Sequence, residues 1–242
     1  MEASSSGLSR NPSVPDIGSI PRRPPSALGA SDRIAIGDFV IDRNEVTIGD
    51  FAAFAEATKL KTAAEQEGGG REWGSGWERR PGWTFRTPYG EPPLDTLEPA
   101  VHVSWHEARG YCAWVGGRLP TREEWLLAAY REHGGGSAAG FVTGTTYRYP
   151  TGATPEGANT SDDDAWARHA PRGATRQGVN GLHDMGGNVW EWLADREGGD
   201  ALTAGGSWWY GPDKMREESM QWKPADFYVA YVGFGCAYDL KS

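Results

Sequence analysis

The chain has 242 residues, and its 24 basic and 33 acidic side chains give a formal net charge of −9. This acidity, without a basic stripe anywhere, argues against nucleic acid or an anionic membrane as the main partner. No run approaches the roughly 20 apolar residues of a membrane-spanning helix, so we expect a soluble protein. The N-terminus lacks a secretory signal, which favours the cytoplasm but leaves export open if the two cysteines form a disulfide. The 34 glycines and 12 tryptophans predict many tight turns and aromatic side chains placed in a core or a groove.

The N-terminal segment, residues 1–31, differs in composition from the rest of the chain. It is rich in Ser, Pro and Gly and has almost no apolar periodicity, which predicts a disordered tail ahead of one domain over residues 32–242. The domain opens with an apolar run from Ile34 to Ile41, whose partial alternation predicts a strand.

Three helices are predicted from their capping residues. Thr47 is suited to cap the N-terminus of a helix that ends before Lys59. The segments Ser104–Glu107 and Thr121–Glu124 are capping boxes, in which a hydroxyl and a glutamate three residues later each accept a backbone N–H of the other residue. The first box opens a helix that runs through Trp114, and the second opens another helix shortly after it.

Regular structure is harder to find elsewhere. Residues 67–93 consist largely of Gly, Trp, Arg and Pro with no sustained period, which predicts a long irregular connection fixed to the core by Trp73, Trp77 and Trp83. Beyond Gly134 the sequence predicts turns, short strands and polar loops. We therefore expect the α+β class with much irregular structure.

Five sequence blocks resemble, in their order, the signature blocks of the formylglycine-generating enzyme, or sulfatase-modifying factor, family. The blocks are Val103–Trp114, Gly117–Trp125, Gly181–Trp192, Gly205–Trp208 and Gly233–Ala237. They cover the chain from about residue 33 to its end. The resemblance implies a variant of the C-type-lectin-like fold, which has little regular secondary structure and agrees with the content of Gly and Trp.

The resemblance also implies an oxidase, but the residues of the family's metal site are replaced. Members of the family convert a cysteine of a sulfatase peptide to an aldehyde, with a copper ion held by two cysteines in the segment after Gly-Gly-Ser-Trp. Counted from Trp208, these positions are Met215 and Met220 in this chain. Two thioethers bind Cu(I) far more weakly than two thiolates. Copper is therefore not expected, and sulfatase activation is the least favoured activity.

Cys112 and Cys236 are the only cysteines, and composition leaves a disulfide, two buried thiols and a reactive thiol open. In the family this pair of positions can carry a disulfide, which the resemblance therefore implies here. A disulfide would indicate export, whereas a cytoplasmic protein would keep both thiols reduced.

The resemblance implies two calcium sites built from carboxylate and carbonyl oxygens, the ligands that this hard cation prefers. The first would use the side chains of Asp184 and Glu191 with the carbonyls of Gly187 and Val189; the second would use Asn159, the carbonyl of Thr160, Asp164 and the carbonyl of Trp166. The alternatives are carboxylates that accept backbone hydrogen bonds in a tight turn, and a solvated acidic loop.

Trp209, Tyr210 and Trp222 lie outside the signature blocks, near the segment in which the family builds its cleft. We expect them to contact a substrate, although aromatic residues more often belong to a core.

Two functions follow for a calcium-stabilised, monomeric protein. One is an atypical oxidoreductase or modifying factor for a peptide, protein or small natural product. The other is a pseudoenzyme or lectin-like module that binds a peptide or glycan.

Overall fold

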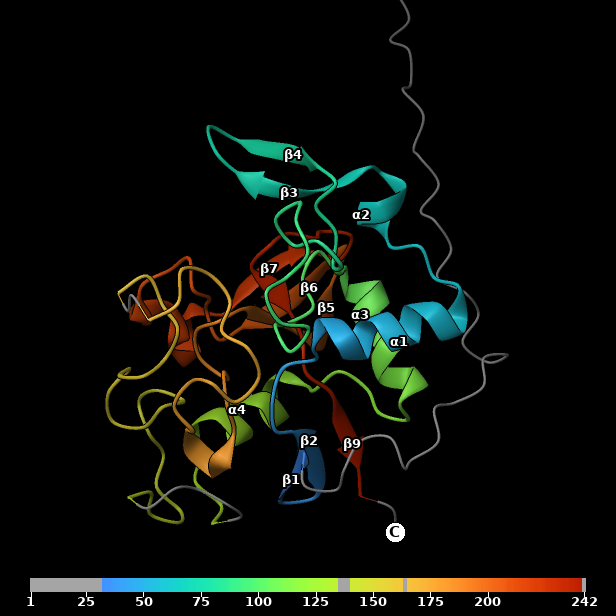
Figure 1. The fold of residues 1–242 in the computed structure, drawn as a ribbon. Helices are drawn as coiled ribbons and strands as arrows, with labels where there is room; N and C mark the ends of the chain where they lie inside the picture. Colours follow the sequence, from blue (N-terminus) through green and yellow to red (C-terminus); the bar gives the residue numbers. More distant parts are fainter. Residues whose placement is uncertain (1–31, 135–139, 163–164, 241–242) are drawn as a thin grey trace, which may run out of the picture.

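A computed structural model of the chain describes residues 32–134, 140–162 and 165–240 (Figure 1). The predicted tail, residues 1–31, lies outside these ranges. The helices and strands are β1 (Arg33–Ile36), β2 (Phe39–Asp42), α1 (Ile48–Thr58), α2 (Ala63–Gln66), β3 (Gly69–Trp73), β4 (Trp77–Pro81), α3 (Trp105–Trp114), α4 (Arg122–Tyr130), η4 (Val179–Gly181), β5 (Trp190–Glu197), β6 (Asp200–Ala204), η5 (Pro212–Met215), η6 (Glu217–Ser219), β7 (Gln221–Pro224), β8 (Val232–Gly233) and β9 (Ala237–Asp239). Within the described ranges, every helix is too short or too polar to span a bilayer.

The three predicted helices are present and begin at the predicted caps. Thr47 caps α1, and Ser104 and Thr121 open α3 and α4 with complete capping boxes. In the first box, the backbone N–H of Ser104 donates to the Glu107 carboxylate at 2.8 Å. The predicted first strand is divided into β1 and β2, which pair as an antiparallel hairpin.

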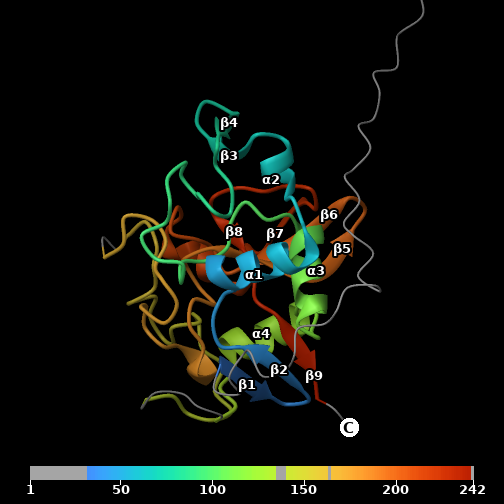
Figure 2. The same cartoon turned by 45° about the vertical axis from the view of Figure 1, so that its right-hand side comes forward.

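The strands form three small sheets. The largest has the order β7-β6-β5-β8, in which β8 runs parallel to β5 and the other pairs are antiparallel. A second sheet has the order β1-β2-β9, so the end of the described chain lies beside its beginning (Figures 1 and 2). The third is the separate hairpin β3–β4. These sheets and the long loops between them agree with the α+β class.

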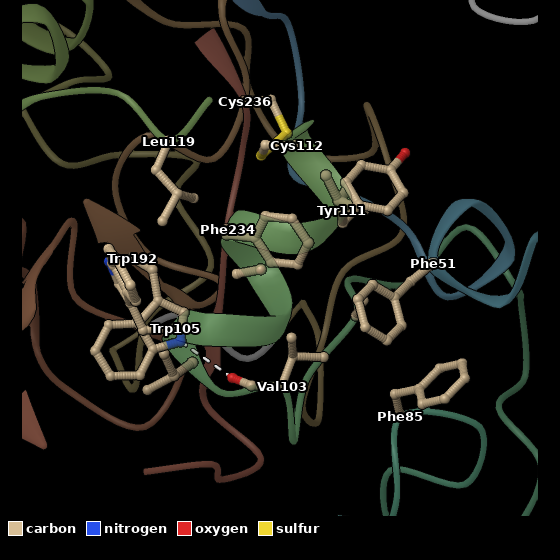
Figure 3. Packing of buried hydrophobic residues seen from close by; sticks show 14 of the residues in the cluster. Phe51, Phe85, Val103, Trp105, Tyr111, Cys112, Leu119, Trp192, Phe234 and Cys236 are labelled. Atoms are coloured by element: carbon tan, nitrogen blue, oxygen red, sulfur yellow. Dashed lines mark hydrogen bonds between the residues drawn. A yellow bond between two sulfur atoms is a disulfide. The ribbon is translucent and has the colours of Figure 1, made fainter. Parts of the chain in front are cut away.

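The main core lies between α1, α3 and the segment that leads into β9. The rings of Phe51, Phe85 and Phe234 are fully buried, and the Phe51 ring meets those of Phe85 and Phe234 at centroid distances of 4.8 and 6.1 Å (Figure 3). The indole N–H of Trp192 donates to the carbonyl of Val103 at 3.0 Å, which ties β5 to the loop before α3. This packing provides the frame on which the irregular loops are mounted.

The predicted disulfide is confirmed. Cys112 on α3 and Cys236 before β9 are bonded, with their Cα atoms 5.5 Å apart, and both are fully buried (Figure 3). The bond joins two positions separated by 124 residues, so it connects the middle of the chain to its end. Neither sulfur is available as a thiolate.

The expectation for residues 67–93 was wrong in two respects. The segment contains the hairpin β3–β4, in which Trp73 pairs with Trp77 across the turn. Its side chains are largely charged or exposed, so no apolar alternation marks the strands. Trp73 is 50% exposed and contacts the Trp77 ring, whereas Trp77, although 44% exposed, packs against Phe227 and the core residue Tyr231. The fully buried aromatic residue of the segment is Phe85, while Trp83 is half-buried against Tyr89.

Candidate functional site

A cavity of about 550 Å³ lies between two loops of the described chain. Its lining combines prolines and aromatic rings with a few charged groups: Pro88, Tyr89, Glu91, Pro92, Pro93, Leu94, Glu98, Ala165, Trp166, Ala167, Arg168 and His169. Pockets for drug-sized ligands have volumes of roughly 300 to 1,000 Å³ and a similar mixture of apolar walls and few polar groups. The cavity is therefore large enough for a small natural product or a peptide side chain.

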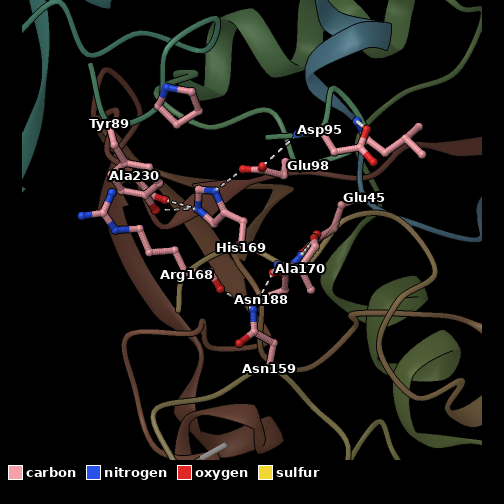
Figure 4. A network of polar contacts seen from close by, with 12 residues as sticks. Glu45, Tyr89, Asp95, Glu98, Asn159, Arg168, His169, Ala170, Asn188 and Ala230 are labelled. Carbon is pink, nitrogen blue, oxygen red and sulfur yellow. Dashed lines mark hydrogen bonds and ion pairs between the residues drawn. The ribbon is translucent and has the colours of Figure 1, made fainter. Parts of the chain in front are cut away.

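One wall of the cavity is held by the buried side chain of His169 (Figure 4). Its Nε2 lies 2.6 Å from the carbonyl oxygen of Ala230 and 3.1 Å from the phenol oxygen of Tyr89. Because the Ala230 carbonyl can only accept, Nε2 carries the proton and donates. The Nδ1 atom faces the Glu98 carboxylate at 3.8 Å. The imidazole thus connects the loops on both sides of the cavity.

The two ionisable partners of His169 respond to this environment. Burial raises the pKa of Tyr89 well above its ordinary value, so the phenol stays neutral and can donate a hydrogen bond. Burial also acts to raise the pKa of Glu98, but the nearby His169 side chain and the hydrogen bond from the backbone N–H of Asp95 outweigh it and lower the pKa. Glu98 is therefore an ionised group at neutral pH.

Two of the three aromatic residues expected to bind substrate meet on the surface beside the cavity. The rings of Trp209 and Tyr210 lie 6.3 and 5.9 Å from that of Tyr231, and the Trp77 ring reaches Tyr231 from the hairpin at 6.3 Å. Phe227 lies against Trp77 at 4.7 Å. We call these five residues the aromatic surface; Tyr231 is buried at its base, and the other four are exposed or partly exposed.

The aromatic surface continues to the cavity through Trp208. Its ring lies 5.1 Å from Trp209 and 6.4 Å from Tyr89 in the cavity wall. Trp222 is 44% exposed on β7 and makes no ring contact with Trp209 or Tyr210 among the described residues. The structure thus groups Trp209 and Tyr210 but does not bring Trp222 to them.

Met215 and Met220 do not form a sulfur pair. Met215 is fully buried and packs with Tyr149 and Ala158. Met220 is half-buried and packs against a different apolar cluster, which includes Ile34. Since the two thioethers lie in separate clusters and both cysteines are bonded to each other, the residues present do not fit a copper site of the family's kind.

The first expected calcium set is buried and rich in carboxylates. Burial raises the pKa of both Asp184 and Glu191 to about 7. The Thr175 hydroxyl donates to Asp184 at 2.7 Å and the Trp125 indole to Glu191 at 2.5 Å, while the carbonyls of Gly187 and Val189 accept no backbone bond among the described residues. Buried carboxylates beside free carbonyls fit a hard cation, which would stabilise their charged forms.

A third buried carboxylate, Glu45, belongs to this region and was missed in the sequence. Burial, followed by the charges of Asp184 and Glu191, raises its pKa well above the ordinary value. It accepts hydrogen bonds from the side chain of Asn188 and the backbone N–H of Val189 at 2.5 and 3.2 Å. In the sequence, Glu45 is marked only as an acidic residue directly before the apolar Val46. The residues that it contacts in the fold lie more than 130 positions away in the chain.

The second expected set is described only in part, because Asp164 lies outside the described residues. Asn159 is buried, and its Nδ2 donates to the carbonyl of Arg168 at 2.7 Å and to Asn188 at 2.9 Å. Its Oδ1 is also buried and has no hydrogen-bond partner among the residues that the structure describes. An orphaned buried oxygen fits a cation ligand. Thr160 is buried next to it, and Trp166 lines the cavity.

The two expected sets of calcium ligands do not consist of ionisable side chains alone. In the part of the chain that the structure describes, no group of three or more His, Cys, Asp and Glu side chains is arranged to hold a metal ion. Each expected calcium set instead combines side-chain and carbonyl oxygens. Such a cation would fix loops and balance charge next to the cavity.

Comparisons with known proteins agree with the resemblance seen in the sequence. A family model, the sulfatase-modifying factor enzyme 1-like domain, matches residues 16–240. A formylglycine-generating enzyme of Thermomonospora curvata is 32% identical over 209 residues, which cover 71% of this chain and 64% of the relative. An inactive C-alpha-formylglycine-generating enzyme 2 of Bos taurus is 31% identical over 208 residues, which cover 69% of this chain and 63% of the relative.

The fold is shared with the structure of PvdO from Pseudomonas aeruginosa, with a TM-score of 0.61 and 21% identity over 84% of this chain and 80% of that one. The chain spans a little less than two thirds of the length of the two curated relatives. One of these relatives is named as an enzyme and the other as inactive, at nearly equal identity. Similarity alone therefore does not decide whether this chain is catalytic.

Proposed function

Because this chain belongs to the sulfatase-modifying factor enzyme 1-like family, we propose that it is an atypical modifying factor that binds a peptide, protein or small natural product. It acts on that substrate without a copper ion held by paired cysteines. The observation that carries the proposal is the cavity of about 550 Å³ beside the aromatic surface. A cavity of this size with adjoining aromatic rings suits a ligand with an apolar body and a few polar groups.

By analogy with the formylglycine-generating relative, the proposed reaction is an oxidation of the substrate, with dioxygen from solution as the electron acceptor. Copper–thiolate chemistry is not part of the proposal, because the only two cysteines form a buried disulfide. What this chain's own residues supply is binding and orientation. His169 holds the Tyr89 phenol in the cavity wall, and a fixed phenol can donate a hydrogen bond to a bound substrate.

We also propose that Ca²⁺ stabilises this site. Asp184 and Glu191 would hold one ion with the carbonyls of Gly187 and Val189, and the orphaned oxygen of Asn159 supports a second ion. The role of the ions is structural, since they would compensate buried negative charge and fix the loops behind the cavity.

A binding module without catalysis is the second candidate. It is favoured by the closed disulfide, which leaves no thiol at all in the chain, and by the similarity to an inactive relative. In that case the exposed rings of the aromatic surface would stack on a peptide or on the apolar face of a sugar.

One experiment separates these functions. The calcium-loaded protein is incubated with a mixture of peptides and small natural products, and both the retained and the released compounds are analysed by mass spectrometry. Retained compounds that gain or lose mass support the modifying factor, and retained compounds of unchanged mass support the binding module. A Tyr89→Phe variant, which keeps the ring but loses the hydroxyl, should reduce modification more than retention. Retention that is unchanged in Trp166→Ala would refute the modifying factor, which binds in the cavity, and retention that is unchanged in Trp209→Ala would refute the binding module.

A parallel incubation with Cu(I) and a cysteine-containing sulfatase peptide tests whether the protein converts the cysteine to an aldehyde, the activity that the proposal excludes. We expect no aldehyde at an enzyme-like rate. Rapid formation of the aldehyde would contradict the proposal, because the reaction would then run without the thiolate pair.

A further inference from the structure

The cavity wall carries an exposed arginine, Arg168, which has no carboxylate partner among the described residues. The guanidinium carbon of Arg168 lies 3.7 Å from the centroid of the Tyr89 ring, a stacking distance. No ion pair joins Arg168 to an acidic side chain of the described residues. By contrast Arg172, four positions later, pairs with Asp50 at 2.6 Å. The protein has a net charge of −9, so acidic side chains that could pair with Arg168 are plentiful. An arginine that pairs with none of those described, at a cavity, therefore indicates a binding site for an anionic group.

The position of this guanidinium is fixed from both ends. At the backbone, the carbonyl of Arg168 accepts a hydrogen bond from Asn159 at 2.7 Å, and the next residue, His169, is buried (Figure 4). At the tip, the guanidinium rests on a ring whose oxygen is held by His169 at 3.1 Å. A stacked arginine loses less freedom when it binds a ligand than a lysine or a free arginine would.

The carboxylates in the cavity lining do not neutralise this charge. Glu98 is engaged elsewhere, since its Oε1 accepts the backbone N–H of Asp95 at 3.3 Å and its Oε2 faces His169 at 3.8 Å. Glu91 is exposed and forms no ion pair with Arg168 among the described residues. The planar fork of the guanidinium therefore remains open to a carboxylate supplied from outside, which it can bind through two parallel hydrogen bonds.

We propose that the cavity binds a ligand with a carboxylate group, which pairs with Arg168, while the apolar body of the ligand contacts Tyr89, Trp166 and the prolines of residues 88–93. This assignment rests on the proposed function and names the chemistry of its substrate. A peptide with a free C-terminus and a carboxylated natural product share this chemistry.

The test uses a matched acid and amide. N-acetyl-L-phenylalanine and its amide have the same aromatic body and differ in charge, and their affinities for the full chain are measured by NMR titration with the Trp166 indole as a local probe. We expect the acid to bind about tenfold more tightly than the amide, because an arginine–carboxylate pair is stronger than a neutral hydrogen bond. The preference should shrink at high salt, which screens an exposed pair.

Variants locate the effect. Arg168→Met keeps an apolar stem against Tyr89 and should abolish the preference for the acid, and Arg168→Lys should restore only part of it. Arg109→Met is the matched control, since Arg109 is also exposed and its guanidinium carbon lies 5.3 Å from the Trp105 ring, outside the cavity lining. Circular dichroism and melting temperatures confirm that each variant folds.

The outcomes separate this inference from the proposed function. Equal affinities of the acid and the amide at the cavity would overturn the carboxylate assignment and leave the proposed function standing. A preference for the acid that survives Arg168→Met would also overturn it. If neither compound shifts the Trp166 signal at millimolar concentration, the assignment fails and the cavity no longer supports the proposed function. If the acid preference is lost only in the Arg168 variants, the assignment stands.

Discussion

The side-chain amide of Asn159 donates a hydrogen bond to the side-chain oxygen of Asn188 at 2.9 Å, and this contact joins the two segments expected to bind calcium. Asn188 in turn donates to Glu45, and Asn159 holds the carbonyl of Arg168 (Figure 4). The first expected site, the second one and the cavity wall therefore belong to one buried network. A cation bound at either set would stabilise loops that shape the cavity.

The first prediction concerns the stability that calcium provides. A ligand that binds only the native state stabilises it by about 4 kcal/mol at a concentration of roughly 1,000 times its Kd. We expect EDTA to lower the melting temperature of the wild type, and Glu191→Gln to reduce this shift. Glu197→Gln is the matched control, because Glu197 is an exposed carboxylate on the same strand, β5. A wild-type protein whose melting temperature does not respond to EDTA would remove the calcium proposal.

The second prediction compares two exposed tryptophans. Trp209 and Trp222 are 40% and 44% exposed, but only Trp209 belongs to the aromatic surface beside the cavity. Loss of an aromatic contact costs about 0.5 to 1.5 kcal/mol beyond the area it buries. Trp209→Ala should therefore weaken binding of N-acetylphenylalaninamide by several-fold, whereas Trp222→Ala should have a smaller effect. Equal losses in the two variants, measured by NMR titration, would show that proximity to the cavity is not what matters.

The elements that sequence predicted well are those whose signals are local. A capping box lies within four residues, and both boxes, Ser104–Glu107 and Thr121–Glu124, open helices in the structure. The hairpin β3–β4 gave no such signal, because charged side chains occupy both of its faces and Trp73 and Trp77, which pair across its turn, stay 50% and 44% exposed. The alternation of apolar and polar residues along a strand arises because one face of the strand is buried. An exposed hairpin buries too little apolar surface to produce that alternation.

The site was harder to predict because it is assembled from distant segments. His169 contacts Tyr89, which is 80 positions earlier, and Ala230, which is 61 positions later. Glu45 reaches Asn188 across 143 positions. A resemblance to known blocks could supply Asp184 and Glu191, since these lie in a signature block, but no pattern of spacing could supply residues that meet only through the fold.

The third prediction concerns the disulfide between Cys112 and Cys236. In the chain-entropy model, a bond that closes a loop of this length, with a separation of 124 residues, stabilises the fold by about 4 to 5 kcal/mol. We expect the Cys112→Ala, Cys236→Ala double variant to unfold at a markedly lower urea concentration. Dithiothreitol should destabilise the wild type and leave the double variant unaffected. If dithiothreitol leaves the wild-type midpoint in place even after complete reduction, the bond does not stabilise the fold.

The last prediction concerns a buried lysine on β7. The Nζ atom of Lys223 donates to the Thr203 hydroxyl at 2.8 Å and to the Gln221 side-chain oxygen at 2.9 Å, and it lies 4.2 Å from the centroid of the Trp190 ring. The indole face favours the ammonium form, but no carboxylate of the described residues pairs with it. Burial therefore dominates and lowers the pKa of Lys223 to about 7.

This shift determines how stability changes with pH. Between about pH 7 and the ordinary lysine value of 10.5, the unfolded chain holds a proton on Lys223 that the folded chain has released. Stability should therefore rise with pH across this window, by up to about 1.4 kcal/mol per pH unit. Lys223→Met removes the titrating group. The free energy of unfolding of the wild type, relative to that of the variant, should therefore increase as the pH rises through this window.

Urea titrations at pH 7, 8 and 9 measure this difference. The exposed Lys61 provides the control, since Lys61→Met should leave the pH dependence of the wild type intact. Parallel curves for the wild type and Lys223→Met would mean that Lys223 keeps its proton in the folded state. The cation–indole contact with Trp190 would then outweigh the cost of burial.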